Sequence, residues 1–287
     1  MRSNRFWLCA FLACLATLPV IVPAKEAMAN EAPNRIRIEY EPPNNPAHQP
    51  LYEMIRERQF LEKLQTIFSP FKFPMEVTIK TLGCDGRANA HYRRPQVLIC
   101  YELLAAIRRE MPLETSVGGV TPIDAEIGQF FFAAAHEMGH AAFDLFSTPI
   151  FGRQEDAADG FATYIMLQLG KSDARRLITG AAYSYRKYLQ HPSVTAPLKD
   201  FSDVHGAPQQ RFFNLICYAY GADPVLFAVF VDKQFLPEHR AKTCRFEYGD
   251  LTWAFRQLIV PHLDQQLAKQ VMDQTWLPPE QEKRPSN

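Results

Sequence analysis

The sequence has no excess of charge of either sign, because 31 Lys and Arg residues balance 31 Asp and Glu residues. Proteins that bind nucleic acid through its phosphates carry basic patches, so this balance gives no indication of a nucleic-acid partner. Internal repeats are also absent, which excludes a repeat architecture. Beyond the N-terminal residues, no segment is apolar for long enough to cross a bilayer. What is present is 287 residues, 47% of them hydrophobic, enough for the core of one large or two small domains.

The N-terminal segment has the parts of a secretory signal peptide. Arg2 and Arg5 form a basic start, residues 6–22 form an apolar run, and residues 27–29 offer a small-residue cleavage site. We therefore predict that residues 1–29 are removed and that the mature protein is periplasmic or secreted, without stable membrane insertion. The alternative is a retained membrane anchor, since the apolar run approaches the length of a membrane span.

The rest of the chain predicts a single domain over residues 30–276 and a disordered tail over 277–287, where prolines are frequent and apolar periodicity is lacking. The predicted fold class is α+β and mainly helical. A small antiparallel sheet is expected to pack on the helix over 124–145, and a helical C-terminal part is expected to follow.

Apolar periodicity places the elements of this fold. Alternating apolar residues predict strands near 36–40, 75–79 and 97–101. Helices are predicted over residues 51–68, 102–111, 124–145, 155–169, 172–189, 209–220, 225–235 and 249–269, the last broken at Pro261. Asp124 is the expected N-cap of the third of these helices, because Asp is among the preferred capping residues.

Removal of the signal peptide would leave four cysteines, namely Cys84, Cys100, Cys217 and Cys244. An even number of cysteines in an exported protein predicts two disulfides, for which three connectivities are possible. Sequence proximity favours Cys84 with Cys100 and Cys217 with Cys244. Free thiols or a structural zinc site are the alternatives, but no CxxC spacing supports a zinc site.

The segment AAAHEMGHAAF contains the residues most informative about function. His136 and His140 are four apart, so on a helix their imidazoles face the same side and can meet one zinc ion, with Glu137 beside them as a base. Apolar flanks predict that this helix is deeply buried, where two histidines and a glutamate are costly without a partner such as a metal. The alternative is a pair of hydrogen-bonded core histidines.

A catalytic zinc site takes three protein ligands and keeps a further position for water. The next predicted helix carries Glu155 and Asp159, again four apart. We predict Glu155 as the third ligand and Asp159 as the carboxylate that orients a ligating histidine. Asp156 competes as a ligand, but its side chain points about 100° away on a helix. Alternatively, these acids form only a helix first turn favoured by the helix dipole.

The combination of HExxH with ExxxD resembles the gluzincin peptidases, the superfamily of thermolysin. The metzincin pattern is not matched, since Phe146 stands where a third histidine would be. The cysteine-ligand motif of peptide deformylase is also absent. The resemblance implies a zincin-type active-site helix, Zn²⁺ as cofactor and a peptide or protein as substrate.

Two further segments extend the resemblance. Asn89 and Ala90 are similar to the segment with which gluzincins form an edge strand that binds the substrate backbone, although His91 stands where an aromatic residue is expected. His205 and Arg211 are similar to the groups that those enzymes direct at the oxyanion, which implies a catalytic role for both. The alternatives are an ordinary turn for the first segment and a helix-capping role for His205.

Over roughly residues 35–265, the order and spacing of these segments resemble a family of secreted bacterial metallopeptidase-like proteins known only as a domain of unknown function. The resemblance implies zinc-dependent hydrolysis of peptide bonds by His136, Glu137, His140 and Glu155. A non-catalytic, zinc-containing envelope protein that binds peptides or partners is the alternative. Hydrolysis of a non-peptide amide uses the same metal chemistry, and several divalent ions suit such a ligand set.

Overall fold

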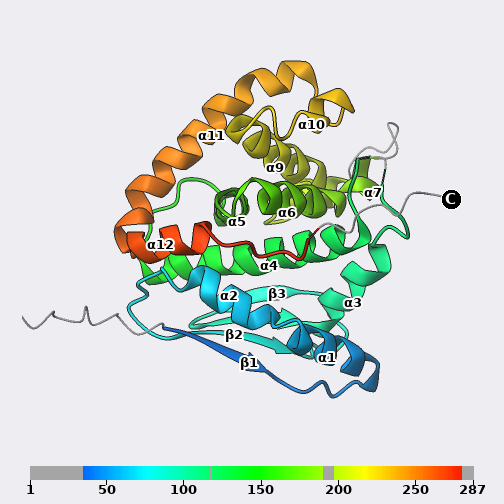
Figure 1. The fold of residues 1–287 in the computed structure, drawn as a ribbon, viewed down its shortest axis with the longest axis vertical. Coiled ribbons are helices and arrows are strands. Elements are labelled where there is room, and N and C mark those ends of the chain that lie inside the picture. The colour runs from blue at the N-terminus through cyan, green and yellow to red at the C-terminus, as the bar shows by residue number, and fades with distance from the viewer. Residues whose placement is uncertain (1–34, 117, 190–196, 280–287) are drawn as a thin grey trace, which may run out of the picture. The chain divides into compact units, whose positions relative to one another are not determined.

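A computed structural model describes residues 35–116, 118–189 and 197–279 of the chain (Figure 1). The predicted signal peptide over 1–29 lies outside the described residues, as do residues 280–287 of the predicted tail. None of the described helices combines the length and the apolar composition that a membrane span requires. The fold class is confirmed, since most described residues are helical and a small sheet lies near the N-terminal end.

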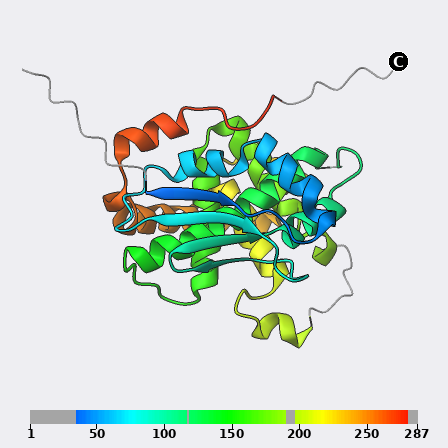
Figure 2. The ribbon, with the colours of Figure 1, turned by 90° about the horizontal axis from the view of Figure 1, so that it is seen from below.

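The sheet contains β1 (Ile36–Tyr40), β2 (Val77–Leu82), β3 (Ala90–Arg93) and β4 (Gln96–Cys100), in the order β1-β2-β4-β3. Figure 2 shows these strands side by side, with β1 in blue. The prediction of an antiparallel sheet was wrong, because only β3 and β4 pair antiparallel and the other pairs are parallel. The chain returns to the start of the sheet through helices between β1 and β2, which makes that pair parallel.

The connection between β1 and β2 contains α1 (Gln49–Glu57) and α2 (Phe60–Phe68), where one helix over 51–68 was predicted. The backbone of Gln59 adopts a left-handed conformation with φ of 53°, which ends the first helix and starts the second in a new direction. Helix α2 packs on β1 and β2. The apolar spacing was therefore that of two helices that bury side chains in the same hydrophobic core.

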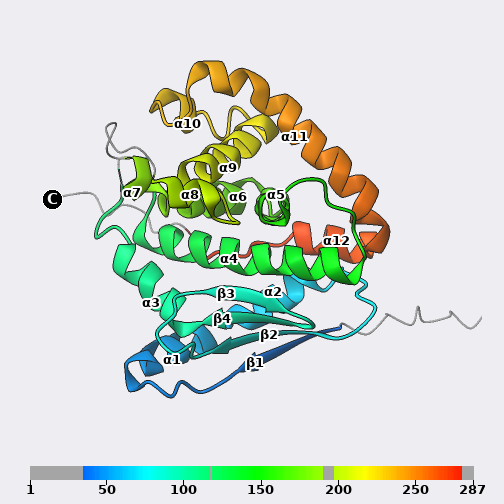
Figure 3. The ribbon, with the colours of Figure 1, turned by 180° about the vertical axis from the view of Figure 1, so that it is seen from behind.

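The long central helix is α4 (Pro122–Leu145), which lies between the sheet and the helices α5 (Gln154–Gln168) and α6 (Lys171–Tyr183) (Figure 3). Its N-cap is Thr121, whose side chain accepts a hydrogen bond from the Asp124 backbone N–H. The predicted cap at Asp124 was wrong. Asp124 is buried and accepts a hydrogen bond from Arg176 Nε at 2.7 Å, which joins α4 to α6.

Helices α4 and α6 approach so closely that a side chain on either at the crossing would collide with the other. A Cβ atom at Gly128 would lie 2.5 Å from Leu177 O, and one at Gly180 would lie 1.9 Å from Asp124 O. Glycine is therefore required at both positions by the packing. This crossing fixes α4 against the helical layer.

The remaining helices lie on the side of α4 away from the sheet or in the connections that lead to and from α4. They are α3 (Tyr101–Glu110), α7 (Arg186–Leu189), α8 (Leu198–Ser202), α9 (Pro208–Ala222), α10 (Val229–Asp232), α11 (Glu238–Leu258) and α12 (Gln265–Met272), with 3-10 turns η1 (Pro46–His48) and η2 (Val260–His262). The helix predicted over 225–235 is reduced to the single turn of α10. The break predicted at Pro261 is confirmed, because this residue lies in η2 between α11 and α12.

Disulfides join Cys84 to Cys100 and Cys217 to Cys244, which confirms the pairs favoured by sequence proximity. The first connects the loop before β3 to the end of β4, and the second connects α9 to α11. Each cross-link restricts the unfolded chain and so stabilises the fold.

The predicted disordered tail begins at Leu277, but the structure includes this residue in the fold. Leu277 is buried, and the backbone N–H groups of Trp276 and Leu277 donate to Asp173 Oδ2. Arg176 Nη1 donates to the carbonyl of Pro278. The prediction for 280–287 stays a prediction.

Candidate metal centre

Helix α4 places His136, Glu137 and His140 next to α5. Gly139 lies at the contact, where a Cβ atom would be 3.2 Å from the side chain of Phe161. The small residue inside HEMGH thus allows α5 to come close to the histidines. His136 and Glu137 are buried, with 4% and 7% of their surfaces exposed.

The chain turns back after α4 so that the first turn of α5 faces the histidines. Ser147 and Gly152 in the connecting loop have φ values of 53° and 95°, left-handed conformations that reverse the chain direction. Glu155 Oε2 consequently lies 2.9 Å from His136 Nε2 and 3.3 Å from His140 Nε2. The predicted third ligand therefore meets the two histidines.

The three candidate ligand atoms suit a divalent ion. His136 Nε2 and His140 Nε2 are 3.1 Å apart, so all pairwise separations, with those to Glu155, lie between 2.9 and 3.3 Å. Tetrahedral zinc with bonds of about 2.0–2.1 Å places its ligand atoms about 3.3–3.4 Å apart. Two imidazole nitrogens that face each other also need a proton or a cation between them. The donor set and its spacing therefore fit a metal ion.

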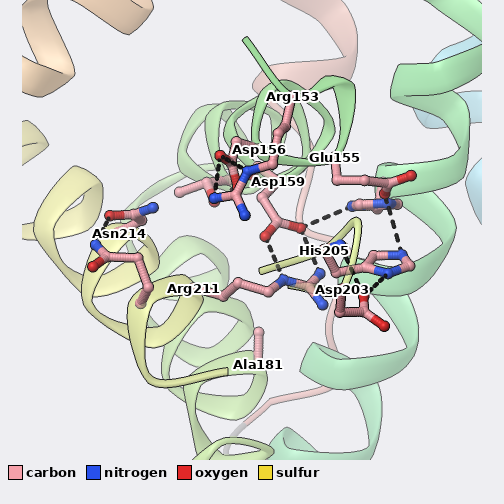
Figure 4. Close-up of polar contacts among 12 residues, drawn as sticks. Arg153, Glu155, Asp156, Asp159, Ala181, Asp203, His205, Arg211 and Asn214 are labelled. Atoms are coloured by element: carbon pink, nitrogen blue, oxygen red, sulfur yellow. Dashed lines mark hydrogen bonds and ion pairs between the residues drawn. The ribbon is translucent and has the colours of Figure 1, made fainter. Parts of the chain in front are cut away.

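Asp159, the predicted orienting carboxylate, contacts the Nδ1 atom of His136, the ring nitrogen that does not face His140 and Glu155. The Nδ1 atom of His136 donates to Asp159 Oδ1 at 2.8 Å. Arg211 donates to the same carboxylate through Nε and Nη2, each at 2.7 Å (Figure 4). A proton fixed on Nδ1 leaves Nε2 of His136 available for a metal.

Opposite charges in this cluster stabilise one another and shift the pKa values of its members. Burial raises the pKa of Asp159, but hydrogen bonds from Arg211 and His136 outweigh burial and lower it to about 2. Burial lowers the pKa of His136, but hydrogen bonds to Asp159 and Glu155 outweigh it and raise this pKa to about 9. The hydrogen bond from His136 lowers the pKa of Glu155 to about 2. A potential that favours a protonated imidazole also favours a cation between these groups.

A cleft of about 480 Å³ opens beside the metal ligands. Its lining residues come from α4, from the start of α5, from the segment around β3 and from the loop before α9, and comprise Asn89, Ala90, His91, Tyr92, Glu137, His140, Asp144, Gln154, Glu155 and His205. The cleft thus brings together the predicted base, two of the three predicted ligands, the predicted edge-strand residues and one predicted oxyanion group. Most of these residues are polar.

Strand β3 lies at the edge of the sheet, next to β4. The side chain of Tyr92 donates to Asp144 Oδ2 at 2.7 Å, and Arg94 forms an ion pair with Asp144 at 3.2 Å. These contacts join β3 to the last turn of α4. Asp144 was not predicted as a site residue. Its position four after His140, on the same helix face, was the available signal.

His205 lines the cleft from a turn before α9 and lies next to Glu155. Its Nε2 atom is 3.2 Å from Glu155 Oε2, and its Nδ1 atom is 3.0 Å from Asp203 Oδ1 (Figure 4). The backbone N–H of His205 also donates to Asp203, which lowers the pKa of that carboxyl. The turn continues into Gly206, where a Cβ atom would lie 2.3 Å from Arg153 Nη1.

Arg211 is not among the lining residues of the cleft. Its guanidinium donates two hydrogen bonds to Asp159. Burial lowers the pKa of Arg211, but this pairing outweighs burial and raises it. The geometry therefore places Arg211 against Asp159, and the predicted role of Arg211 at the oxyanion stays a prediction. Gln154 was not predicted as a site residue. Its Oε1 atom accepts a hydrogen bond from His140 Nδ1 at 3.1 Å. Asp159 accepts the corresponding hydrogen bond from His136.

A family model described as "Putative metallopeptidase", DUF4344, matches residues 40–259. The matched segment is well over half of the chain and contains all the lining residues of the cleft as well as Asp159 and Arg211. No curated protein and no solved structure matches the chain.

Proposed function

Because the chain belongs to the DUF4344 family of "Putative metallopeptidase" proteins, we propose that it is a zinc-dependent peptidase of the gluzincin type. The supporting observation is the convergence of His136 Nε2, His140 Nε2 and Glu155 Oε2 within 2.9 to 3.3 Å of one another. Two imidazoles and one carboxylate form a three-ligand set that leaves room for water, whereas structural zinc sites usually have four protein ligands. Zinc is the proposed ion among the divalent ions that such donors accept.

The proposed mechanism assigns the proton transfers to Glu137. A bound ion supplies Lewis acidity to the scissile carbonyl and to the attacking water. Glu137 lines the cleft beside the ligands, where its carboxylate takes the proton of the water and passes it to the leaving amine. His205 also lines the cleft, and in this proposal the N–H group of its Nε2 donates to the oxyanion.

The proposed substrate is an extended peptide or protein segment that lies along β3. An edge strand offers main-chain groups for hydrogen bonds with a peptide of varied sequence. Asn89 and Ala90 orient this peptide toward Glu137. Asp159 and Arg211 are positioning residues in this proposal, since they act through His136.

The proposed location is the periplasm or the exterior of the cell. Disulfides persist in oxidising compartments, and the pairs Cys84–Cys100 and Cys217–Cys244 support such a location. The predicted signal peptide over 1–29 would provide the export.

The substitution Glu137→Gln tests the proposal. The variant is expected to retain zinc, because the ligands are unchanged, and to lose about 10²–10⁴-fold in hydrolysis of a peptide library. Zinc content and cleavage are measured on the same preparation. A variant as active as the parent would remove Glu137 from the mechanism. A parent protein that loses stability on chelation, yet cleaves neither peptides nor cell-wall amides, would favour the non-catalytic alternative.

A further inference from the structure

A second cavity, of about 410 Å³, lies away from the metal centre. It is lined by the loop before α4 and by residues of α6, α7, α9 and α10, helices that Figure 3 shows on the side of α4 away from the sheet. Its described lining residues include none of those that line the metal cleft. Its volume is within the range of about 300–1,000 Å³ that is typical of small-molecule sites.

The walls of this cavity are mainly apolar. Aromatic and aliphatic side chains form most of the surface, among them Val120, Ala182, Phe212, Phe230 and Phe235. An apolar body of a ligand therefore loses water on entry without leaving polar protein groups unpaired, which favours binding.

Arg186 is the one charged residue among the described lining residues. Its guanidinium carbon lies 4.1 Å from the centre of the Tyr183 ring, which holds the group against the wall. Its Nη1 atom is buried and has no hydrogen-bond partner among the described residues. A buried charged donor without an acceptor is costly, so the guanidinium of Arg186, which lines this cavity, lacks an acceptor that an anionic group could supply.

The other polar side chains of the cavity do not share this requirement. Thr179 donates its hydroxyl to the backbone carbonyl of Arg175, and Ser116 Oγ accepts from the Val120 backbone N–H. One cation in an apolar surrounding matches a ligand with one negative charge. A phosphate dianion would bring a second charge that no described lining residue pairs.

We propose that this cavity binds an apolar monocarboxylate, with the carboxylate on Arg186 and the apolar body against α9 and α10. Guanidinium and carboxylate form paired, charge-assisted hydrogen bonds, which makes this head group the best match for the unpaired Nη1 atom. A fatty acid and the C-terminal residue of an apolar peptide both have this chemistry. The proposal does not rest on the peptidase function.

Calorimetric titration of the purified full chain tests the proposal with three probes of equal chain length, namely dodecanoate, dodecanol and dodecyltrimethylammonium, each below its micelle concentration. Dodecanoate is expected to bind saturably, at one site, and at least roughly tenfold more tightly than the alcohol, because only the carboxylate pairs with a buried charge. The ammonium probe is expected not to bind. Equal affinities for all three, or no saturable binding of any carboxylate probe, would overturn the proposal.

Variants of the cavity test separately how the charge of Arg186 and the apolar space contribute to ligand binding. Arg186→Met is expected to weaken dodecanoate binding by roughly tenfold or more and to remove the preference over dodecanol. The same replacement at the exposed Arg245 of α11 is the matched control and is expected to change neither. Val229→Trp fills the cavity but keeps the arginine, and it is expected to abolish binding even if Arg186→Met fails to fold. Thermal unfolding without ligand checks the fold of each variant. Parent-like binding by a folded Arg186→Met protein, or by a folded Val229→Trp protein, would contradict the assignment.

A further arm distinguishes the two sources of the carboxylate. An acetylated leucyl-phenylalanine peptide is titrated as its free acid and as its amide. Tighter binding of the free acid than of dodecanoate assigns the cavity to peptide C-termini, and the reverse assigns it to fatty acids. Binding of acid and amide with equal affinity would contradict the role of Arg186.

Discussion

The two sides of the metal cleft are built from different kinds of structure. The metal side consists of His136, His140 and Glu155, which come from the packed helices α4 and α5. The substrate side consists of Asn89 and Ala90, at the sheet edge, and His205, in a turn before α9. The side chain of His136 is 6% exposed, whereas that of His205 is 45% exposed.

This difference separates two tasks. Groups that must hold an ion at fixed separations gain from long helices whose side chains are already ordered by packing. Groups that meet a peptide must stay accessible to it, which an edge strand and a turn provide. In this account, substitutions on the metal side change zinc binding, and substitutions on the substrate side change turnover or substrate affinity while zinc stays bound.

The largest effect is expected for Glu155→Ala, which removes a ligand from the metal side. Zinc content is expected to fall to background and hydrolysis to fall by about 10³-fold or more, because the ion contributes several kcal/mol to the transition state. Asp156→Ala is the matched control, since Asp156 pairs with Arg153 and does not line the cleft. Retention of zinc by the Glu155→Ala protein would show that Glu155 is not a metal ligand.

On the substrate side, His205→Ala is expected to lower kcat by about 10²–10³-fold, as does the loss of an oxyanion donor. Zinc content is expected to stay at the parent level, because this side chain is not among the three candidate ligands. Steady-state kinetics and elemental analysis of the same samples check both statements. His239→Ala, at an exposed position of α11, is the control. Loss of zinc from the His205→Ala protein would show that His205 contributes to metal binding and would contradict the division into two sides.

Asp159→Asn is expected to weaken zinc binding by about 10–100-fold, because the carboxylate that orients His136 loses its charge. Arg211→Met is expected to change zinc affinity in the same direction by a smaller factor. Both variants are expected to keep the parent kcat at saturating zinc, and Asp250→Asn on the exposed face of α11 is the control. If Arg211→Met instead lowered kcat with zinc affinity unchanged, Arg211 would belong to the substrate side, as the sequence predicted.

The smallest effect is expected for Tyr92→Phe, which removes the hydrogen bond between β3 and Asp144. KM for peptides is expected to rise a few-fold with kcat retained, and the free energy of unfolding is expected to fall by about 1 kcal/mol. Denaturant unfolding and steady-state kinetics measure these changes. Tyr188→Phe, at an exposed position, is the control. A Tyr92→Phe protein with lower kcat and parent KM would argue against β3 as the peptide-binding edge.

Helix geometry made part of the metal side predictable from the sequence. Residues four apart face the same side of a helix, so HEMGH and the pair Glu155 and Asp159 indicated which side chains can meet. The turn that brings α5 back to α4 was not predicted, because it depends on the left-handed conformations of Ser147 and Gly152. The disulfide pairs followed from the short separations between their cysteines.

Contacts between distant elements could not be predicted in the same way. The pairing of Arg211 with Asp159 joins residues 52 positions apart and depends on how α9 packs on α5. The parallel pairing of β1 with β2 depends on the path of the chain through α1 and α2, which apolar alternation does not record. The N-cap of α4 was misassigned because the Asp124 carboxylate accepts a hydrogen bond from Arg176 of α6 and does not cap the helix.

The zinc content of the purified chain tests the central claim most directly. Elemental analysis is performed after zinc loading and dialysis, and again after treatment with a chelator. One zinc ion per chain is expected, which the chelator removes and reloading restores. A chain that retains no divalent ion in stoichiometric amount after loading would contradict a metal centre at His136, His140 and Glu155.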